Sequence, residues 1–378
     1  MDTSPSTQTP GGGGRADGIL AALAGLGALA FLVGLLGGSA TRTWATFLVN
    51  FLFWSGLAIA GPAIAGIFEL TEARWTARLR RLATTTVAFL PVSFVLLLGA
   101  GTLYPWIGRP VASKAAWLNL PFMVLRIGVG LGALYWVSIR FARAVHGSPA
   151  GAAEEPGRSA RARLAVVMLF LYVIVGSLLG YDLVMSLDPQ WFSGLFGGYF
   201  VVGTVYSGFA FLVLLVGIRS AGRPGWVLPP GEMQDLAKLV FATSVLWMYF
   251  FWSQYLVIWY GNVPIETRYV LTRFFQDPWR SLAVLAFFIG WLIPFSYLLA
   301  RLTGRPPQSH RLLVGVACLS LLAIFVERTV LVFPSIFKTP VFPYGVTDVL
   351  VTLGFGALFA LSFRVLLPRL GLTSGAEA

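Results

Sequence analysis

The sequence is poor in the side chains that hold redox centres and metal ions. Its 378 residues include one cysteine, Cys318, and two histidines, His146 and His310. A single cysteine excludes an internal disulfide and any cysteine-ligated zinc site or iron–sulfur cluster. Both histidines lie near loop ends, which argues against an internal bis-histidine haem. The sequence therefore predicts a chain that binds no redox cofactor of its own.

Charged residues are also scarce. They make up 11% of the chain, whereas hydrophobic residues make up 57%, and the mean hydropathy is +0.80. Such a composition excludes an ordinary soluble protein. The formal net charge is +12, but most Lys and Arg lie in short segments between apolar runs, where they act as topology signals. We therefore expect a membrane protein and no nucleic-acid partner.

Apolar runs of about 20 residues, the length that a bilayer core requires, recur along the chain. They lie at about 18–37, 43–70, 82–104, 119–145, 163–186, 192–218, 235–260, 280–301, 311–333 and 346–367. The polar segment 1–17 is expected to be a disordered tail. The sequence thus predicts an all-α polytopic membrane protein with about ten transmembrane helices.

The distribution of basic residues predicts the orientation of these helices. Of the 27 Lys and Arg, 18 lie on the side that both termini share and 7 lie on the other side. By the positive-inside rule, both termini are expected in the cytoplasm.

A weak internal repeat divides the ten runs into two halves. An offset of 152 aligns Ser55-Gly56 with Ser207-Gly208, and an offset of 145 aligns Asp182 with Glu327 and Pro189 with Pro334. A parallel repeat of this kind is typical of membrane proteins built by duplication. We therefore expect two four-helix bundles, 43–186 and 190–334, with peripheral helices at 18–37 and 346–367 and a cytoplasmic tail at 368–378.

Polar side chains occur inside several apolar runs at a similar depth. They are Asn50, Arg126, Asp182, Gln254, Glu327 and Arg328. At about 1.5 Å per residue, each lies about 10 Å from the outer end of its helix. An ionisable group inside a span costs about 2.5–3.5 kcal/mol and normally faces a partner in the bundle interior. We expect Arg126 to pair with Asp182, and Glu327 to pair with Arg328 or another cation.

Two interpretations of this polar layer remain open. Its members are buried ion pairs and hydrogen bonds that hold helices together, or they line a proton route or the headgroup pocket of a quinone. Two residues at the inner ends of spans are further proton-path candidates: Glu69, which is more typical of a solvated helix end, and His146, which is more typical of an interfacial residue. Tyr255, next to Gln254, either packs or adds a hydroxyl to a proton chain. Asp348 is expected to cap the last helix.

The outward segment 261–279 carries aromatic residues, prolines and both signs of charge. Its most individual part is 262–268, Asn-Val-Pro-Ile-Glu-Thr-Arg. We expect Asn262, Glu266 and Arg268 to contribute to the docking of another protein.

Two of these stretches resemble a known family. Residues 252–266 read Trp-Ser-Gln-Tyr-Leu-Val-Ile-Trp-Tyr-Gly-Asn-Val-Pro-Ile-Glu, and residues 185–192 read Met-Ser-Leu-Asp-Pro-Gln-Trp-Phe. With the acid–arginine pair that precedes Pro334, they resemble the NrfD-like integral membrane subunits of bacterial alternative complex III, in particular the smaller, ActF-type subunits. The likeness covers runs two to nine. Gln190 departs from it, because His is expected at that position.

The resemblance implies a ten-span subunit of a quinol:electron-acceptor oxidoreductase of a respiratory or photosynthetic chain, in the bacterial cytoplasmic membrane. Its implied neighbours are a homologous larger NrfD-like subunit, the better candidate for quinol oxidation, and extracytoplasmic iron–sulfur and cytochrome c subunits that carry the clusters and haem c. Lipid and menaquinone are implied nearby. The resemblance also implies proton conduction, for which Asp182 and Glu327 are the matching positions.

Two alternatives stay open at the level of the sequence. A secondary transporter also places ionisable groups in its spans, although a parallel repeat disfavours the inverted-repeat type. The membrane anchor of a polysulfide- or sulfoxide-reductase-type complex shares the NrfD-like fold.

Overall fold

The computed structural model describes residues 11–97, 104–107, 111–148, 157–222, 228–302, 310–337 and 341–372. The regular structure of these residues is helical. Within them, ten helical segments are long and apolar enough to cross a membrane. The chain is therefore an all-α, multi-pass membrane protein, as the apolar runs predict.

The spans are interrupted at three places by tighter or wider helical turns. In chain order they are α1 (Gly11–Leu36), α2 (Ala40–Leu70), α3 (Ala77–Thr84) with η2 (Thr85–Phe89) and α4 (Leu90–Leu96), α5 (Leu120–Gly147), α6 (Arg158–Leu178) with η5 (Leu179–Val184), α7 (Phe196–Gly222), α8 (Pro230–Gly261), α10 (Trp279–Phe287) with η7 (Phe288–Leu292) and α11 (Ile293–Leu302), α12 (His310–Ile336) and α13 (Val346–Arg369). A short helix, α9 (Pro264–Phe274), follows α8. The segments η5 and η7 are π-helices, which are rare and are frequently found at functional sites.

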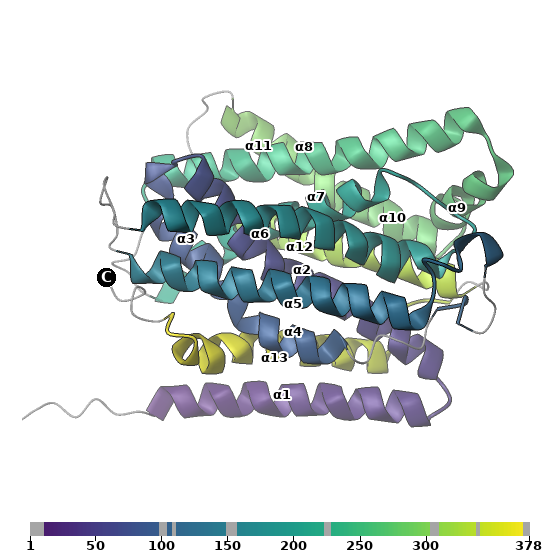
Figure 1. Ribbon diagram of the computed structural model, residues 1–378, viewed down its shortest axis with the longest axis horizontal. Coiled ribbons are helices and arrows are strands. Elements are labelled where there is room, and N and C mark those ends of the chain that lie inside the picture. Colours follow the sequence, from purple (N-terminus) through teal and green to yellow (C-terminus); the bar gives the residue numbers. More distant parts are fainter. Residues whose placement is uncertain are drawn as a thin grey trace, which may run out of the picture.

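By their contacts the helices form two groups of four with two peripheral helices. The peripheral helices α1 and α13 lie along one edge of the array (Figure 1). In the first group, α2 contacts α3, α5 and α6. In the second group, α7 contacts α8 and α12, and α10 and α11 pack against α12 and α8. Contacts of α2 with α7 and α12 join the groups, while α1 packs mainly on α13. The two expected bundles and the two peripheral helices are thus present.

Equivalent glycines of the repeat join the two bundles. A Cβ atom added to Gly56 of α2 would lie 3.0 Å from the Thr204 side chain of α7. A Cβ atom added to Gly208 of α7 would lie 2.6 Å from the Cβ atom of Ala60 of α2. Small residues of this kind let two helix backbones approach closely. The two helices that the 152-residue offset relates therefore pack against each other through the residues that it aligns.

The first helix starts earlier than the sequence predicts. Residues 11–17 were expected to belong to a disordered tail, but α1 begins at Gly11. Within this first part of α1, Asp17 forms an ion pair with Arg364 of α13, and this contact fixes the start of α1 against the last helix. Residues 1–10, and residues 373–378 of the expected C-terminal tail, lie outside the described part of the chain.

The start of α1 and the end of α13 lie at the same end of the helix array (Figure 1). We call this the terminal end, and the end that holds α9 the opposite end. The connection from α2 to α3 lies at the terminal end, and that from α8 to α9 lies at the opposite end. The candidate residues can be placed relative to these two ends.

Candidate functional site

The polar layer of the first bundle is centred on Asp182, which η5 carries in the half of its span nearest the opposite end. The carboxylate is fully buried, with 0% relative exposure. Arg126 of α5 donates from Nε to Oδ2 at 2.6 Å and from Nη2 to Oδ1 at 2.7 Å. The indole Nε1 of Trp117 donates to Oδ1 at 2.9 Å. The expected pair is confirmed, and both of its carboxylate oxygens have donors.

A row of hydroxyl groups lies midway along the first bundle. Ser55 of α2 and Ser93 of α4 share a hydrogen bond of 2.6 Å between their Oγ atoms. The Oγ atom of Ser93 lies 2.8 Å from the hydroxyl of Tyr135 of α5. Each hydroxyl can both donate and accept, so the row can pass a proton between its members.

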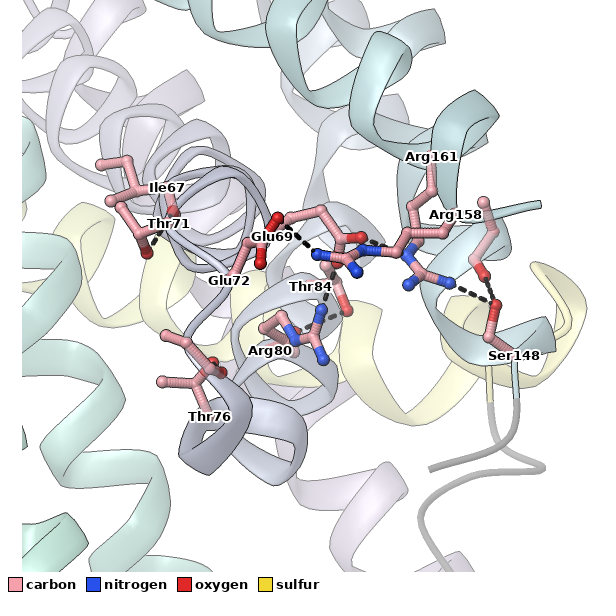
Figure 2. A network of polar contacts seen from close by, with 12 residues as sticks. Ile67, Glu69, Thr71, Glu72, Thr76, Arg80, Thr84, Ser148, Arg158 and Arg161 are labelled. Carbon is pink, nitrogen blue, oxygen red and sulfur yellow. Dashed lines mark hydrogen bonds and ion pairs between the residues drawn. The ribbon is translucent and has the colours of Figure 1, made fainter. Parts of the chain in front are cut away.

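A second buried carboxylate of the first bundle lies at the terminal end (Figure 2). Glu69 at the end of α2 is 5% exposed. It forms ion pairs with Arg80 of α3 and with Arg161 of α6, the latter at 2.7 Å from Nε to Oε1. Arg161 also donates to Ser148 Oγ at 2.6 Å. The interpretation of Glu69 as a solvated helix end is therefore wrong, because the next helix, α3, and the distant helix α6 both bring arginines over it.

Nearby residues of the terminal end differ in exposure. Glu72 is solvated, and its carboxylate pairs with Arg158 at 2.7 Å. His146 lies in the last turn of α5, as expected of an interfacial residue, but its ring is buried. Its Nε2 atom lies 3.1 Å from the Thr84 hydroxyl. The same Nε2 atom lies 3.3 Å from the Arg81 carbonyl oxygen.

The second bundle holds the other expected pair, on α12. Arg328 donates from Nη1 to Oε2 of Glu327 at 2.7 Å, and both side chains are buried. The guanidinium also lies over the Phe200 ring of α7, 4.0 Å from its centroid. The Tyr199 hydroxyl of α7 is a further hydrogen-bond partner of the Glu327 carboxylate. Glu327 thus has partners from its own helix and from α7.

Glu327 faces a cavity of about 340 Å³. Its walls are α8, α9, α10 and α12, with the start of α7 and the segment before it, and they are mainly aromatic and aliphatic. Side chains in the walls that carry a polar atom are Trp191, Tyr199, Trp247, Trp252, Gln254, Tyr255, Tyr269, Arg273 and Glu327. A mainly apolar cavity with a few converging polar groups is the usual form of a small-molecule site.

The sequence did not reveal two of these wall residues, Tyr269 and Arg273 of α9. Arg273 is 2% exposed, and it donates to the Leu331 carbonyl at 3.0 Å and to Ser335 Oγ at 2.5 Å. Its guanidinium lies 3.4 Å from the Tyr269 ring centroid. Burial lowers the pKa of Arg273, and burial raises the pKa of Tyr269 to about 12, with Arg273 opposing that rise. In the sequence, these two residues lie four positions apart in a helix that starts at Pro264. That spacing places them on the same helix face, and it is the only signal of their contact.

The remaining members of the expected layer do not meet in one cluster. Asn50 donates to Thr352 of α13 at 3.0 Å, on the side of the peripheral helices. Gln254 accepts from Ser193 Oγ at 3.0 Å, and Tyr255 is half-buried. Asp348 accepts from the Gly345 N–H and caps α13, as expected. Among the described residues, the polar layer is therefore divided between the two bundles and the α13 side.

The candidate docking residues lie at the opposite end, around α9. Asn262 has a φ of 45° and ends α8, and Glu266 lies in the first turn of α9. Arg268 donates to the side chains of Gln190 at 3.0 Å and Asp188 at 3.4 Å. Arg268 thus binds the connection between the two bundles, whereas Glu266 is partly exposed on the surface.

Neither a metal site nor a known relative assigns a function to the described part of the chain. Within the described ranges, no group of three or more His, Cys, Asp or Glu side chains is placed to hold a metal ion. No protein-family model matches the chain, and no curated protein matches it significantly. The features of the structure that bear on function are therefore the buried ionisable groups and the cavity.

Proposed function

We propose that the chain is a cofactor-free membrane subunit of a quinol-oxidising electron-transfer complex of the alternative complex III type, which it anchors and through which it conducts protons. The observation that carries the proposal is the pair of buried carboxylates, Asp182 and Glu327, at positions that the internal repeat relates. Each lies beside an arginine inside a membrane span. Charged groups at such positions are costly and commonly mark proton or ion routes.

Other buried groups extend each carboxylate towards the terminal end. In the first bundle the hydroxyl row from Ser55 to Tyr135 lies between Asp182 and the Glu69 cluster along the spans. In the second bundle the Tyr206 hydroxyl of α7 donates to Ser320 Oγ at 2.7 Å. Ser320 lies about two helical turns before Glu327 on α12, towards the terminal end. These groups supply the donors and acceptors that a proton route requires.

Asp182→Asn and Glu327→Gln test proton conduction, because both changes keep the size of the side chain and remove the exchangeable proton. Both also remove the anion of a buried ion pair, so failure to assemble would report on that pair and not on proton movement. We expect each complex that assembles to keep its full cofactor content and to move fewer protons per electron in proteoliposomes. Turnover falls instead if proton movement and electron transfer are obligatorily coupled. Wild-type proton yield and turnover in both variants would show that the carboxylates only hold helices together. The control is Ser220→Ala at the terminal end of α7, because the Ser220 hydroxyl donates to the Val216 carbonyl of its own helix.

The proposal includes an orientation with both termini in the cytoplasm. A reporter fused after the C-terminus is expected to be active only in the cytoplasm, and one inserted at Ile265 of α9 only outside it. The 18 to 7 distribution of basic residues motivates this expectation. A cytoplasmic signal from Ile265 would contradict the orientation. A reporter at Gly151, which lies outside the described residues, is likewise expected to be active in the cytoplasm.

The surface of α9 is proposed to dock an extracytoplasmic partner subunit. Glu266→Lys reverses one partly exposed charge there, and we expect it to lower the amount of partner that co-purifies with the tagged chain. Glu72→Lys, the same change at the terminal end, is the matched control and should leave recovery unchanged. Equal recovery with both variants would remove α9 from the interface. Arg268 is less suitable because its loss also releases Asp188 and Gln190.

A further inference from the structure

We infer that the cavity of the second bundle holds one acyl chain of an anionic phospholipid from the leaflet at the opposite end, with the lipid phosphate bound by Arg280 of α10. The inference assigns the cavity and an exposed arginine to a single amphiphilic ligand. It is independent of the proposed function, because it requires neither a redox partner nor proton movement.

The walls of the cavity are almost wholly apolar. They are formed mainly by aromatic and aliphatic side chains. Wall residues that carry polar atoms present carbon to the cavity, since Trp247 Nε1, Tyr269 Oη and Glu327 Oε1 have almost no accessible surface. A cavity of about 340 Å³ with such walls stays dry but takes up apolar molecules. The part of the ligand inside it is therefore a hydrocarbon.

The cavity extends along the span direction for about the depth of one leaflet. On α8 its wall runs from Trp247 to Ile258, about 16 Å along the helix axis. Ile258 lies in the last turn of α8, at the opposite end. One leaflet contributes about 15 Å of hydrocarbon, half of a bilayer core. A helix of a partner subunit, about 10–12 Å wide, is too thick for this volume, whereas one acyl chain fits it.

The cavity opens to the lipid-facing surface between α8 and α10. Trp252 of α8, Val284 of α10 and Phe288 of η7 line it. Their relative exposures of 52%, 48% and 46% place the same side chains on the outer surface of the helix array. In a bilayer this surface faces hydrocarbon, so an acyl chain can enter from the side without crossing a polar region.

Arg280 places a cation at the head of this opening. It lies in the first turn of α10, four residues before Val284 and seven before Phe287, so it shares a helix face with two wall residues. Trp259 and Tyr260, which are 66% and 86% exposed, end α8 at the same end of the molecule. Exposed Trp and Tyr of this kind mark the level of the lipid headgroups. A phosphate at Arg280 thus has its chains directly below it.

The charge of Arg280 is available to such a phosphate. The side chain is exposed and has no hydrogen bond or ion pair within the described part of the chain. Asp277, three residues earlier, instead accepts from Ser281 Oγ at 2.6 Å. Arg268 of α9 is bound by Asp188 and Gln190. A neutral amphiphile would make no use of Arg280, and free phosphate would make no use of the cavity.

The test uses the purified, delipidated full-length chain in nonionic detergent and phosphatidylglycerol that carries a diazirine in the middle of one acyl chain. We expect saturable labelling of the wall residues Trp247, Met248 or Phe251, mapped by mass spectrometry. Unlabelled phosphatidylglycerol should displace the probe, and glycerol 3-phosphate should not. Labelling confined to Leu246 and Val257, which are exposed and lie outside the walls, would show only annular lipid and would overturn the inference.

A headgroup comparison tests the role of Arg280. A diacylglycerol probe with the same chains should need about fivefold more for half-saturation, the factor expected for one arginine near a lipid phosphate. Arg280→Gln should weaken phosphatidylglycerol labelling by about the same factor and leave diacylglycerol labelling unchanged. Arg268→Gln, at the same end, is the matched control and should change neither. Equal half-saturation of the two probes in the unmodified chain would overturn the assignment of a phospholipid.

A second pair of variants tests the cavity itself. Ala283→Phe fills the cavity from α10 and should abolish wall labelling by both probes. Leu285→Phe on the same helix is the control, because Leu285 is 43% exposed and lies outside the walls, and labelling should persist. Wall labelling that is unchanged in Ala283→Phe would contradict the site.

Discussion

Replacing Arg126 by alanine is expected to destabilise the folded protein by about 3–5 kcal/mol, because it leaves the fully buried Asp182 carboxylate without its cation. Of the three N–H groups that donate to the carboxylate, only the Trp117 indole would remain. Thermal unfolding of the detergent-solubilised chain, followed by circular dichroism, measures the effect. The expected result is a much lower melting temperature or failure to recover monodisperse protein.

Two controls distinguish loss of the pair from loss of an arginine. Arg268→Ala removes an exposed arginine that lies 3.4 Å from Asp188, and it should cost about 0–1 kcal/mol. The double variant Arg126→Met with Asp182→Leu removes both charges and should be more stable than Arg126→Ala, because no uncompensated charge remains. A melting temperature for Arg126→Ala within the range of Arg268→Ala would show that Asp182 is not the buried anion that the structure places there.

Glu69→Gln is expected to have the second largest effect. It removes the anion between Arg80 and Arg161, whose side chains are only 20% and 7% exposed. Since Arg80 retains some access to water, we expect a loss of about 3 kcal/mol, the lower end for a broken buried pair. Unfolding in detergent measures it, with Glu72→Gln as the control. Glu72 lies three residues away and pairs with a half-exposed arginine, so its change should cost about 0–1 kcal/mol. Equal melting temperatures for both variants would contradict the burial of Glu69.

The sequence predicts those features that depend on one helix or on a strong physical cost. Apolar run length predicts the ten spans, and the cost of a charge in a membrane predicts that Asp182 and Glu327 have arginine partners. The turn chemistry of Asp348 predicts the cap of α13. Each of these follows from neighbouring residues or from a single energetic rule.

Features that depend on several helices at once were not predictable. Glu69 looks like a solvated helix end in sequence, but α3 and α6 bring Arg80 and Arg161 over it. Arg273 counts as a loop cation in sequence, but α9 folds inward and buries it against α12. The cavity beside Glu327 likewise depends on side chains from four helices. The position of a polar residue along its span indicates its depth in the membrane but not its neighbours, so the sequence does not show that the polar layer divides between the bundles.

The central claim is that this chain belongs to a quinol-oxidising complex whose redox centres are carried by partner subunits. The most direct test is affinity purification of the tagged chain from native membranes in mild detergent, followed by subunit identification and optical and paramagnetic resonance spectra. The account predicts co-purified c-type haem, iron–sulfur clusters and a second multi-pass membrane subunit, with quinol reduction of the haem. Recovery of the chain alone, with transport activity, or with a molybdopterin-containing catalytic subunit, would contradict it.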